Sequence, residues 1–215
     1  MRLLPVTVIL LVALVAGCRD STIIATGHSP ADTDSIDSNP AGSDSVDTDT
    51  APLLPRLRVD LNMIGRAEDE TNEPDYTPWT IEKADTVSRD FDGISVTLAR
   101  TGDAGSFLTT AWYKAGVQPP VLARLANDGV IVADGDVGAQ IEMTISGLPQ
   151  GTHTLLTWHN TVDNPDGITF APMNISVNGT TEEEAMALSN RALTNTDAAS
   201  AYLTFAVADG EDVVI

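Results

Sequence analysis

Alternation of apolar and polar residues is the feature that most constrains the fold of this chain. It recurs in many short runs from residue 57 to the C-terminus, and Gly, Asn, Asp and Pro residues bound these runs. A period of two is typical of strands with one buried face, because successive side chains of a strand point to opposite sides. Asp92-Gly93 and Asn178-Gly179 are pairs that favour tight hairpins. The sequence therefore predicts an all-β fold over residues 55–215, an antiparallel β-sandwich (jelly roll) of nine or ten strands.

Two segments depart from the simple alternation. Residues 180–193 are compatible with a short helix, since Thr180 and Glu183 match a capping box, or with a strand. Residues 64–88 carry Tyr76 and Trp79 among charged residues and prolines, which predicts a long loop between the first two strands. Long loops inside compact domains are usually functional, so this segment is a candidate for ligand binding.

The N-terminus has the pattern of a secretory leader. Arg2 precedes an apolar run, and small residues follow it, which predicts a signal peptide over residues 1–17. The run ends in Val15-Ala16-Gly17-Cys18, which resembles the bacterial lipobox. That resemblance implies that Cys18 is lipidated, that it becomes the mature N-terminus, and that the protein is a lipoprotein of the outer membrane or cell surface. Because Cys18 is the only cysteine, no disulfide can form within the chain.

Residues 18–54 are rich in Asp, Ser and Thr and poor in apolar residues. Such a segment cannot bury enough surface to offset its ordering entropy, so we predict a disordered linker. The formal net charge of the whole chain is −20, and seven of its acidic residues lie in this linker. A chain this acidic has no basic patch with which to displace counterions from nucleic acid, so nucleic acid is excluded as a partner.

Familiar catalytic and metal-binding patterns are missing from the sequence. His153 and His159 would lie roughly 20 Å apart on one strand and so cannot share a zinc ion, and His28 falls in the predicted linker. The run Asp134–Gly138 lacks the later ligands of an EF-hand loop. There is no Gly-x-Ser-x-Gly motif. We find no acid in an apolar setting that would raise its pKa. With 31 acidic residues in the chain, a catalytic pair of carboxylates stays open as an alternative. We therefore expect no enzyme activity from this chain alone and assign no metal ligand.

Several short motifs resemble those of malectin-like and galactose-binding-like β-sandwich domains. They are Leu148-Pro149-Gln150-Gly151, the strand end Leu155–His159, Val177-Asn178-Gly179, Val59–Asn62 with the following Asp75–Trp79, and Ala123-Arg124. The likeness is scattered over residues 60–205. It implies a domain that binds a polysaccharide or oligosaccharide without catalysis. It implies no cofactor, though related sandwiches often hold one structural calcium.

Sugars stack an apolar face on aromatic rings, while amide, imidazole and charged groups hydrogen-bond their hydroxyls. Among the ten aromatic residues, several stand beside polar or turn residues. We expect Trp79, in the predicted loop, and Trp158, at a strand end, to be stacking platforms. The full set of predicted saccharide-binding residues is Tyr76, Trp79, Trp112, Trp158, His159 and Asn160.

Two other interpretations remain open at this point. The chain ends inside an apolar run, Val213–Ile215, which is compatible with the N-terminal module of a larger polysaccharide lyase or glycoside hydrolase. A structural or protein-binding surface domain would also fit the same pattern. The saccharide, the oligomeric state and the presence of calcium do not follow from the sequence.

Overall fold

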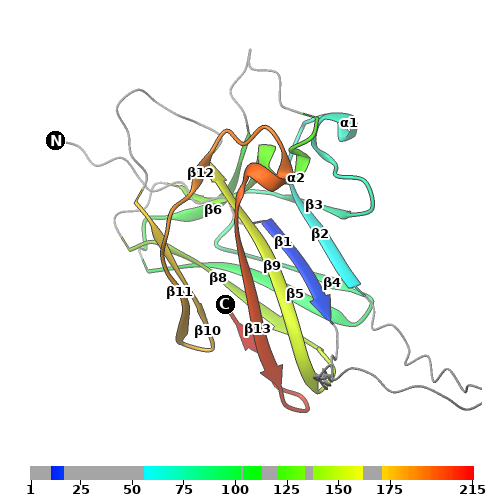
Figure 1. The fold of residues 1–215 in the computed structure, drawn as a ribbon, viewed down its shortest axis with the longest axis vertical. Helices are drawn as coiled ribbons and strands as arrows, with labels where there is room; N and C mark the ends of the chain where they lie inside the picture. The colour runs from blue at the N-terminus through cyan, green and yellow to red at the C-terminus, as the bar shows by residue number, and fades with distance from the viewer. Residues whose placement is uncertain (1–10, 17–55, 103, 113–120, 134–137, 162–170) are drawn as a thin grey trace, which may run out of the picture.

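The computed structural model describes residues 11–16, 56–102, 104–112, 121–133, 138–161 and 171–215 (Figure 1). Cys18 and the whole linker predicted over residues 18–54 lie outside these residues. The strands are β1 (Leu11–Ala16), β2 (Arg56–Met63), β3 (Thr77–Ile81), β4 (Thr86–Phe91), β5 (Ile94–Thr101), β6 (Phe107–Trp112), β7 (Asp128–Ala133), β8 (Gln140–Ser146), β9 (Gly151–Thr161), β10 (Met173–Val177), β11 (Thr180–Met186), β12 (Ser189–Asn190), β13 (Ala199–Val207) and β14 (Val213–Val214). The helices are α1 (Glu68–Thr71), α2 (Arg124–Asn127) and the 3-10 turn η1 (Asn195–Asp197).

Strands dominate the structure, which confirms the predicted all-β class. The largest sheet runs in the order β12-β9-β1-β2-β3, and β13 also pairs with β9. A second sheet runs in the order β14-β8-β5-β4, and β6–β7 and β10–β11 form two-stranded ribbons. Most pairs are antiparallel, but β2 with β3 and β9 with β12 are parallel. Alternation cannot foresee that difference, because both kinds of strand have the same side-chain period.

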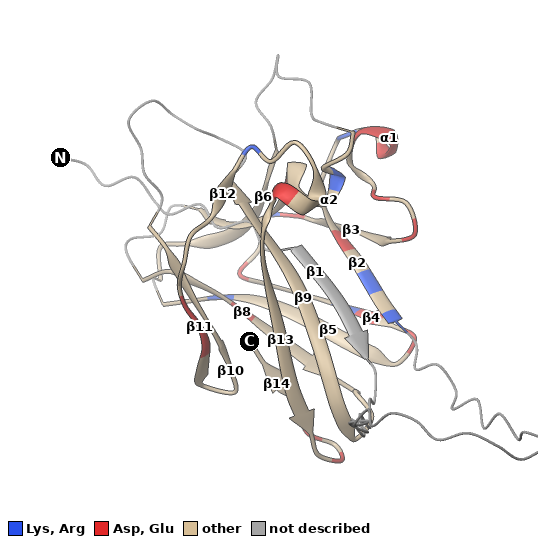
Figure 2. Cartoon of the chain, in the orientation of Figure 1, with Lys and Arg blue, Asp and Glu red and all other residues tan. Residues whose placement is uncertain are grey.

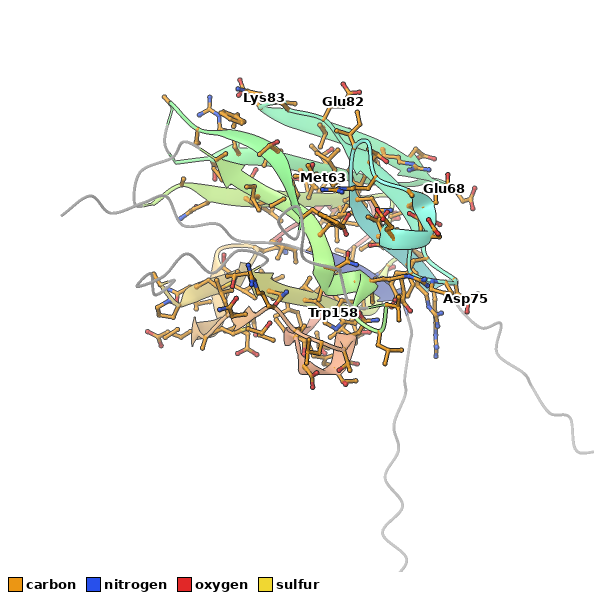
Figure 3. The ribbon with its side chains drawn as sticks, turned by 90° about the horizontal axis from the view of Figure 1, so that it is seen from above. Met63, Glu68, Asp75, Glu82, Lys83 and Trp158 are labelled. Carbon is orange, nitrogen blue, oxygen red and sulfur yellow. The ribbon has the colours of Figure 1, made fainter. Side chains whose placement is uncertain are left out.

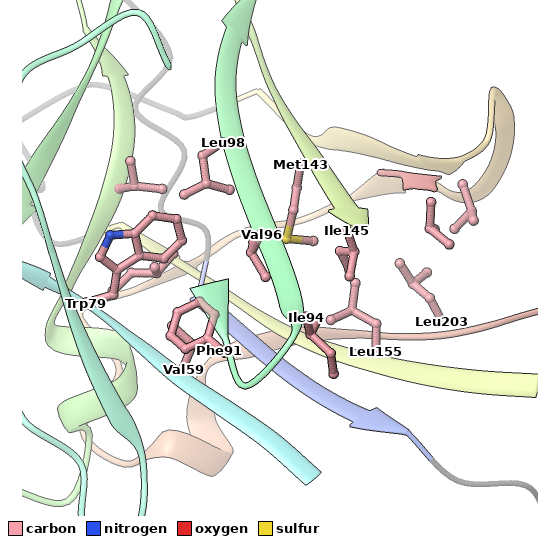
Figure 4. Close-up of a cluster of buried hydrophobic side chains, with 14 of the residues drawn as sticks. Val59, Trp79, Phe91, Ile94, Val96, Leu98, Met143, Ile145, Leu155 and Leu203 are labelled. Atoms are coloured by element: carbon pink, nitrogen blue, oxygen red, sulfur yellow. The ribbon is translucent and has the colours of Figure 1, made fainter. Parts of the chain in front are cut away.

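The hydrophobic core lies between the two larger sheets (Figure 4). From the four-stranded sheet, β5 contributes Val96 and Leu98, and β8 contributes Met143 and Ile145. They pack in one cluster with apolar residues of the largest sheet, among them Val59, Leu155 and Leu203. These side chains occupy alternate positions in their strands, as the sequence predicts.

Positive backbone angles identify the predicted hairpins. Asp92 and Gly93, between β4 and β5, have φ of 54° and 89°. Asn178 and Gly179, between β10 and β11, have φ of 49° and 79°. Two successive residues with positive φ form a type I′ turn, whose twist matches that of the flanking strands. The ambiguous segment after this turn is therefore strand β11 rather than a helix.

Residues 64–88 are not one long loop, as the sequence had predicted. They contain helix α1 and strand β3, and β3 extends the largest sheet beside β2. Strand β3 alternates exposed and buried residues at its end, with Trp79 and Ile81 buried. The prolines and charged residues around it obscured this short strand, because Pro78 removes a backbone donor.

Residues 11–16, which belong to the predicted signal peptide, form strand β1 at the centre of the largest sheet. Strand β1 pairs antiparallel with β2 on one side and with β9 on the other. Its register runs from Leu11 opposite Trp158 to Ala16 opposite His153. The same residues thus have a predicted role as a leader and an observed place as a strand.

Charges are unevenly placed on the domain (Figure 2). Acidic residues gather on α1 and on β11, whereas Arg56 and Arg58 make one end of β2 basic. Within the described part of the chain, no helix combines the length and the apolar character needed to cross a membrane.

Candidate functional site

A pocket with a volume of about 380 Å³ opens between strands β2 and β3 and the segment around α1. Its polar lining comes from amides, hydroxyls and charged side chains, namely Asn62, Arg66, Glu68, Thr71, Asn72, Thr80 and Arg89. Met63, Gly65, Pro78 and Trp79 complete the wall. In Figure 3 the labelled Met63 and Glu68 mark this side of the molecule. The volume lies within the range of small-ligand sites.

Two arginines of the pocket are held in place by neighbouring groups. The Nη1 atom of Arg89 donates a hydrogen bond of 2.6 Å to the carbonyl oxygen of Pro78. The guanidinium carbon of Arg66 lies 3.3 Å from the centre of the Trp112 ring. Cation–π contacts of this kind orient an arginine over the face of an aromatic ring. Both guanidinium groups are thus positioned before any ligand arrives.

The structure corrects the expectation that Trp79 is exposed. Its side chain is only 7% exposed and belongs to the core cluster. The ring packs edge-to-face on Phe91, with ring centres 5.7 Å apart. It is buried because Trp79 lies on strand β3, which faces the core, and not in a loop. Trp79 is among the residues that line the pocket, although its ring packs in the core on the same face as Leu61.

A buried group of polar side chains adjoins the pocket. Asp60 and Asn62 point to the same side of β2, and Asn127 and Asp128 stand where α2 meets β7. All four are at most 3% exposed. The backbone N–H of Met63 donates to Oδ2 of Asp128 at 2.8 Å, and that of Glu73 donates to Oδ2 of Asp60 at 2.7 Å. We call these four residues the carboxylate–amide cluster.

Burial perturbs both carboxyl groups of this cluster. Desolvation raises the pKa of Asp60 to about 7, against the lowering effect of the Glu73 backbone hydrogen bond. Desolvation likewise raises the pKa of Asp128 well above its usual value, and the nearby charge of Asp60 adds to the rise. The expectation that no acid occupies an apolar setting is therefore wrong. Asp60 stands between the core residues Val59 and Leu61, but a solvent-exposed strand position has the same pattern, so the sequence carries no signal for its burial.

Tyr76 and Trp158 are the two predicted site residues that the structure brings together. Their ring centres lie 6.5 Å apart in an edge-to-face arrangement, and both side chains are half-buried. The guanidinium carbon of Arg58 lies 5.7 Å from the centre of the Tyr76 ring. Trp158 packs on a small cluster of buried alanines at α2 and η1. This aromatic pair does not line the pocket, and Figure 3 shows Trp158 apart from Met63 and Glu68.

His159 and Asn160 are buried and not at an exposed strand end, which corrects their expected exposure. His159 is 0% exposed, and its Nε2 lies 2.7 Å from Oγ1 of Thr157. The Nδ2 of Asn160 donates to the Ala126 carbonyl, and its Oδ1 accepts from Ser189 and Ala192. The Asn160 side chain thus links strand β9 to the segments that cover this face of the strand, α2 and the chain around β12. The His159 ring lies on the opposite face with Leu155 and Thr157, and its hydrogen bond stays within β9.

Trp112, the last predicted site residue, lies at the end of β6. Its ring is half-buried against Ile131 and is covered by Arg66, as described above. It contributes to the pocket indirectly, through the arginine that it holds. The carboxylate–amide cluster was not predicted, because its burial depends on α1 and α2, two one-turn helices with no amphipathic pattern of their own. The arginines were not predicted either, because Arg89 is placed by its bond to Pro78 and Arg66 by the Trp112 ring.

Hydrogen bonds hold the two histidines of the domain. The Nε2–H of His153 donates a hydrogen bond of 2.7 Å to the Pro149 carbonyl. Across the described residues, no group of three or more His, Cys, Asp and Glu side chains is arranged to hold a metal ion.

Comparisons of the chain with models of protein families, with curated proteins and with solved structures found no match. The resemblance to malectin-like and galactose-binding-like domains therefore stays a prediction, and the geometry of the site carries the functional argument.

Proposed function

We propose that this protein binds a saccharide without catalysis, in the pocket beside Trp79. The observation that carries the proposal is the composition of the pocket wall. Amides, hydroxyls and two oriented arginines make up much of the pocket wall, and Met63, Pro78 and Trp79 contribute its apolar part. Hydroxyl-rich ligands need many such hydrogen-bonding partners together with an apolar patch on which a sugar ring can rest.

Binding without catalysis fits the position of the acids. The two carboxyls with raised pKa, Asp60 and Asp128, are 0% exposed, and neither lines the pocket. Glu68 is the acid that lines it. Retaining and inverting glycosidases place two carboxyl groups on either side of the scissile bond. A sugar bound in this pocket would have one carboxyl group beside it, that of Glu68, and not the pair that these enzymes use.

We further propose that the domain is a jelly-roll sandwich and that it is held at a bacterial membrane surface by lipid on Cys18. The two larger sheets with the core between them support the first part. The lipobox-like sequence at residues 15–18 supports the second. A linker of 36 residues, from residue 19 to residue 54, would then separate the anchor from the domain.

A glycan array followed by affinity electrophoresis tests the saccharide proposal. The array identifies the ligand, and gels containing that polysaccharide measure retention of Arg89→Ala and of Thr80→Val. Each loses a hydrogen-bonding group of the pocket wall, and a hydrogen bond to a charged group contributes about 1.5–3 kcal/mol. We therefore expect binding to weaken roughly 10- to 150-fold for Arg89→Ala, and less for Thr80→Val.

Arg56→Ala is the matched control, because it removes the same charge from an exposed position on β2 away from the pocket. It should bind like the wild type. An array without any positive saccharide would refute carbohydrate binding. If a saccharide binds but only Tyr76→Ala and Trp158→Ala weaken it, the function stands and the site is the aromatic pair instead.

A further inference from the structure

The carboxylate–amide cluster contains an unusual concentration of unpartnered oxygens. Within the described residues, the buried side-chain oxygens that lack a hydrogen-bond partner are Oδ1 of Asp60, Asn62, Asn127 and Asp128. The other buried atoms without a partner there are nitrogens, and they lie in Trp112, Arg124, His153 and His159. Buried polar groups in folded proteins are nearly always paired. Four unpaired oxygens in one cluster therefore call for a ligand.

Each of the four side chains is anchored by its second polar atom. Oδ2 of Asp60 and Oδ2 of Asp128 accept backbone N–H groups, as described above. The Nδ2 of Asn62 donates to Oδ1 of Asn72, and the Nδ2 of Asn127 donates to the Glu70 carbonyl at 3.0 Å. These bonds fix the orientation of every side chain and leave one oxygen of each free. Anchoring of this kind is what orients ligands in metal sites.

The cluster draws these residues from two segments that the fold holds together. Strand β2 packs against β7, and α1 packs against α2. The bond from Met63 to Asp128 ties the start of β7 to β2, and the bond from Asn127 to Glu70 ties the end of α2 to α1. Asp60 and Asp128 are close enough for the charge of one to affect the other.

The charge of the cluster identifies the class of ligand. When both are ionised, the two carboxyl groups supply two negative charges, and in the described part of the chain no Lys or Arg side chain forms a salt bridge with either of them. The unpartnered atoms of the cluster that could coordinate an ion are all oxygens, from two carboxyl groups and two amides. Hard divalent cations prefer such oxygen donors, and calcium takes carboxylates together with amide and backbone carbonyl groups.

We propose that Asp60, Asn62, Asn127 and Asp128 bind one calcium ion. The ion neutralises both buried carboxylates and takes the four free oxygens as ligands. Calcium is favoured over magnesium, because side chains anchored in the fold cannot easily provide the small octahedral shell that magnesium requires. Since Asn62 also lines the pocket, the ion would stabilise one part of the pocket wall.

Thermal unfolding of the full-length chain, first in EGTA and then in CaCl₂, tests this proposal. Calcium at about 100 times its Kd should raise the Tm by roughly 5–10 °C in a domain of this size. Elemental analysis after desalting should find one calcium per chain, and the same concentration of MgCl₂ should produce a smaller shift. A wild-type protein that binds no calcium at millimolar concentration, and whose Tm does not change, would overturn the proposal.

The variants Asp60→Asn and Asp128→Asn keep the shape of each side chain and remove one charge. Each should weaken calcium binding at least tenfold and abolish most of the Tm shift. In EGTA each should melt no lower than the wild type, because it replaces an acid whose ionisation burial disfavours with a neutral amide of the same shape. Asp69→Asn is the control, since it removes the same charge from the exposed surface of nearby α1 and should respond to calcium like the wild type.

A calcium shift that persists in both cluster variants, or that disappears equally in Asp69→Asn, would show a nonspecific effect of charge and refute the site. Should both cluster variants fail to fold, Asn127→Ala provides an uncharged loss of one ligand, and the calcium content of the wild type still decides the question. Saccharide binding is measured separately, so either proposal can fail without the other.

Discussion

The variant Trp79→Ala tests whether the Trp79 ring is part of the hydrophobic core. The ring is almost fully buried and packs on Phe91. We expect Trp79→Ala to lower the free energy of unfolding by about 3–5 kcal/mol, because truncation of a buried aromatic removes its burial and leaves a cavity. Urea titration followed by circular dichroism measures the change.

Tyr202→Ala is the control for this prediction, because it removes a large ring that is 63% exposed on β13. Its cost should stay below about 1 kcal/mol. A loss for Trp79→Ala as small as that of the control would mean that the ring is not part of the core.

Burial of His159 makes stability depend on pH. The ring lies in the interior, and desolvation lowers its pKa from 6.5 to about 4. Between pH 4 and pH 6.5 the His159 ring is therefore neutral in the folded state, whereas the same ring carries a proton in the unfolded chain. This contribution to stability is fully present above pH 6.5 and is lost as the pH falls towards 4. It amounts to roughly 3 kcal/mol.

The variant His159→Gln isolates this effect, since every other titrating group is present in both proteins. The difference in unfolding free energy between pH 7 and pH 4.5 should be smaller in the variant than in the wild type. Denaturant titrations at several pH values provide the measurement. Identical pH profiles would show that His159 is accessible to protons in the folded state.

At the scale of elements, strand β1 has two incompatible roles. If residues 1–17 are removed as a leader, β2 and β9 lose the strand that lies between them. In an antiparallel strand, alternate residues direct their amides to opposite neighbours. In a chain that begins at Cys18, the amides of β9 that face β13 should therefore stay protected, while those that face β1 should exchange at least tenfold faster.

Hydrogen exchange followed by NMR would show this period of two along residues 153–158, and the β5–β8 pair provides the internal control. Uniform protection along β9 would mean that β2 and β9 pair directly once β1 is gone. In that case the structure of the processed domain differs from the full chain at this sheet.

The elements also show what the sequence could and could not predict. Alternation placed the buried faces of β5 and β8 correctly, because each strand packs one face on the core. It missed β3, where Pro78 and neighbouring charges mask a five-residue strand. It also missed the carboxylate–amide cluster, of which Asp60 and Asn62 occupy polar positions of β2 and the other two residues lie where α2 meets β7. Helices α1 and α2 cover that face, and one turn of helix leaves little trace in a sequence.

At the scale of the whole molecule, net charge determines how the protein can associate with a membrane. The formal charge of −20 opposes binding to anionic lipid surfaces, which attract basic segments instead. Within the described residues, moreover, no helix meets the requirements of a membrane span. Acyl chains attached to Cys18 would supply the missing affinity, at about 0.8 kcal/mol for each buried methylene, and stable anchoring takes more than one such signal.

Membrane association should therefore depend on Cys18 alone. We expect the wild-type chain to incorporate a labelled fatty acid and to sediment with membranes, and Cys18→Ala to lose both properties. Because Cys18 precedes the folded domain by a long linker sequence, the variant should keep the Tm of the wild type, which is the control for misfolding. If Cys18→Ala remains labelled and membrane-bound, the lipid anchor is refuted. If it loses the label but still sediments with membranes, another part of the molecule must bind lipid, against the repulsion that its charge predicts.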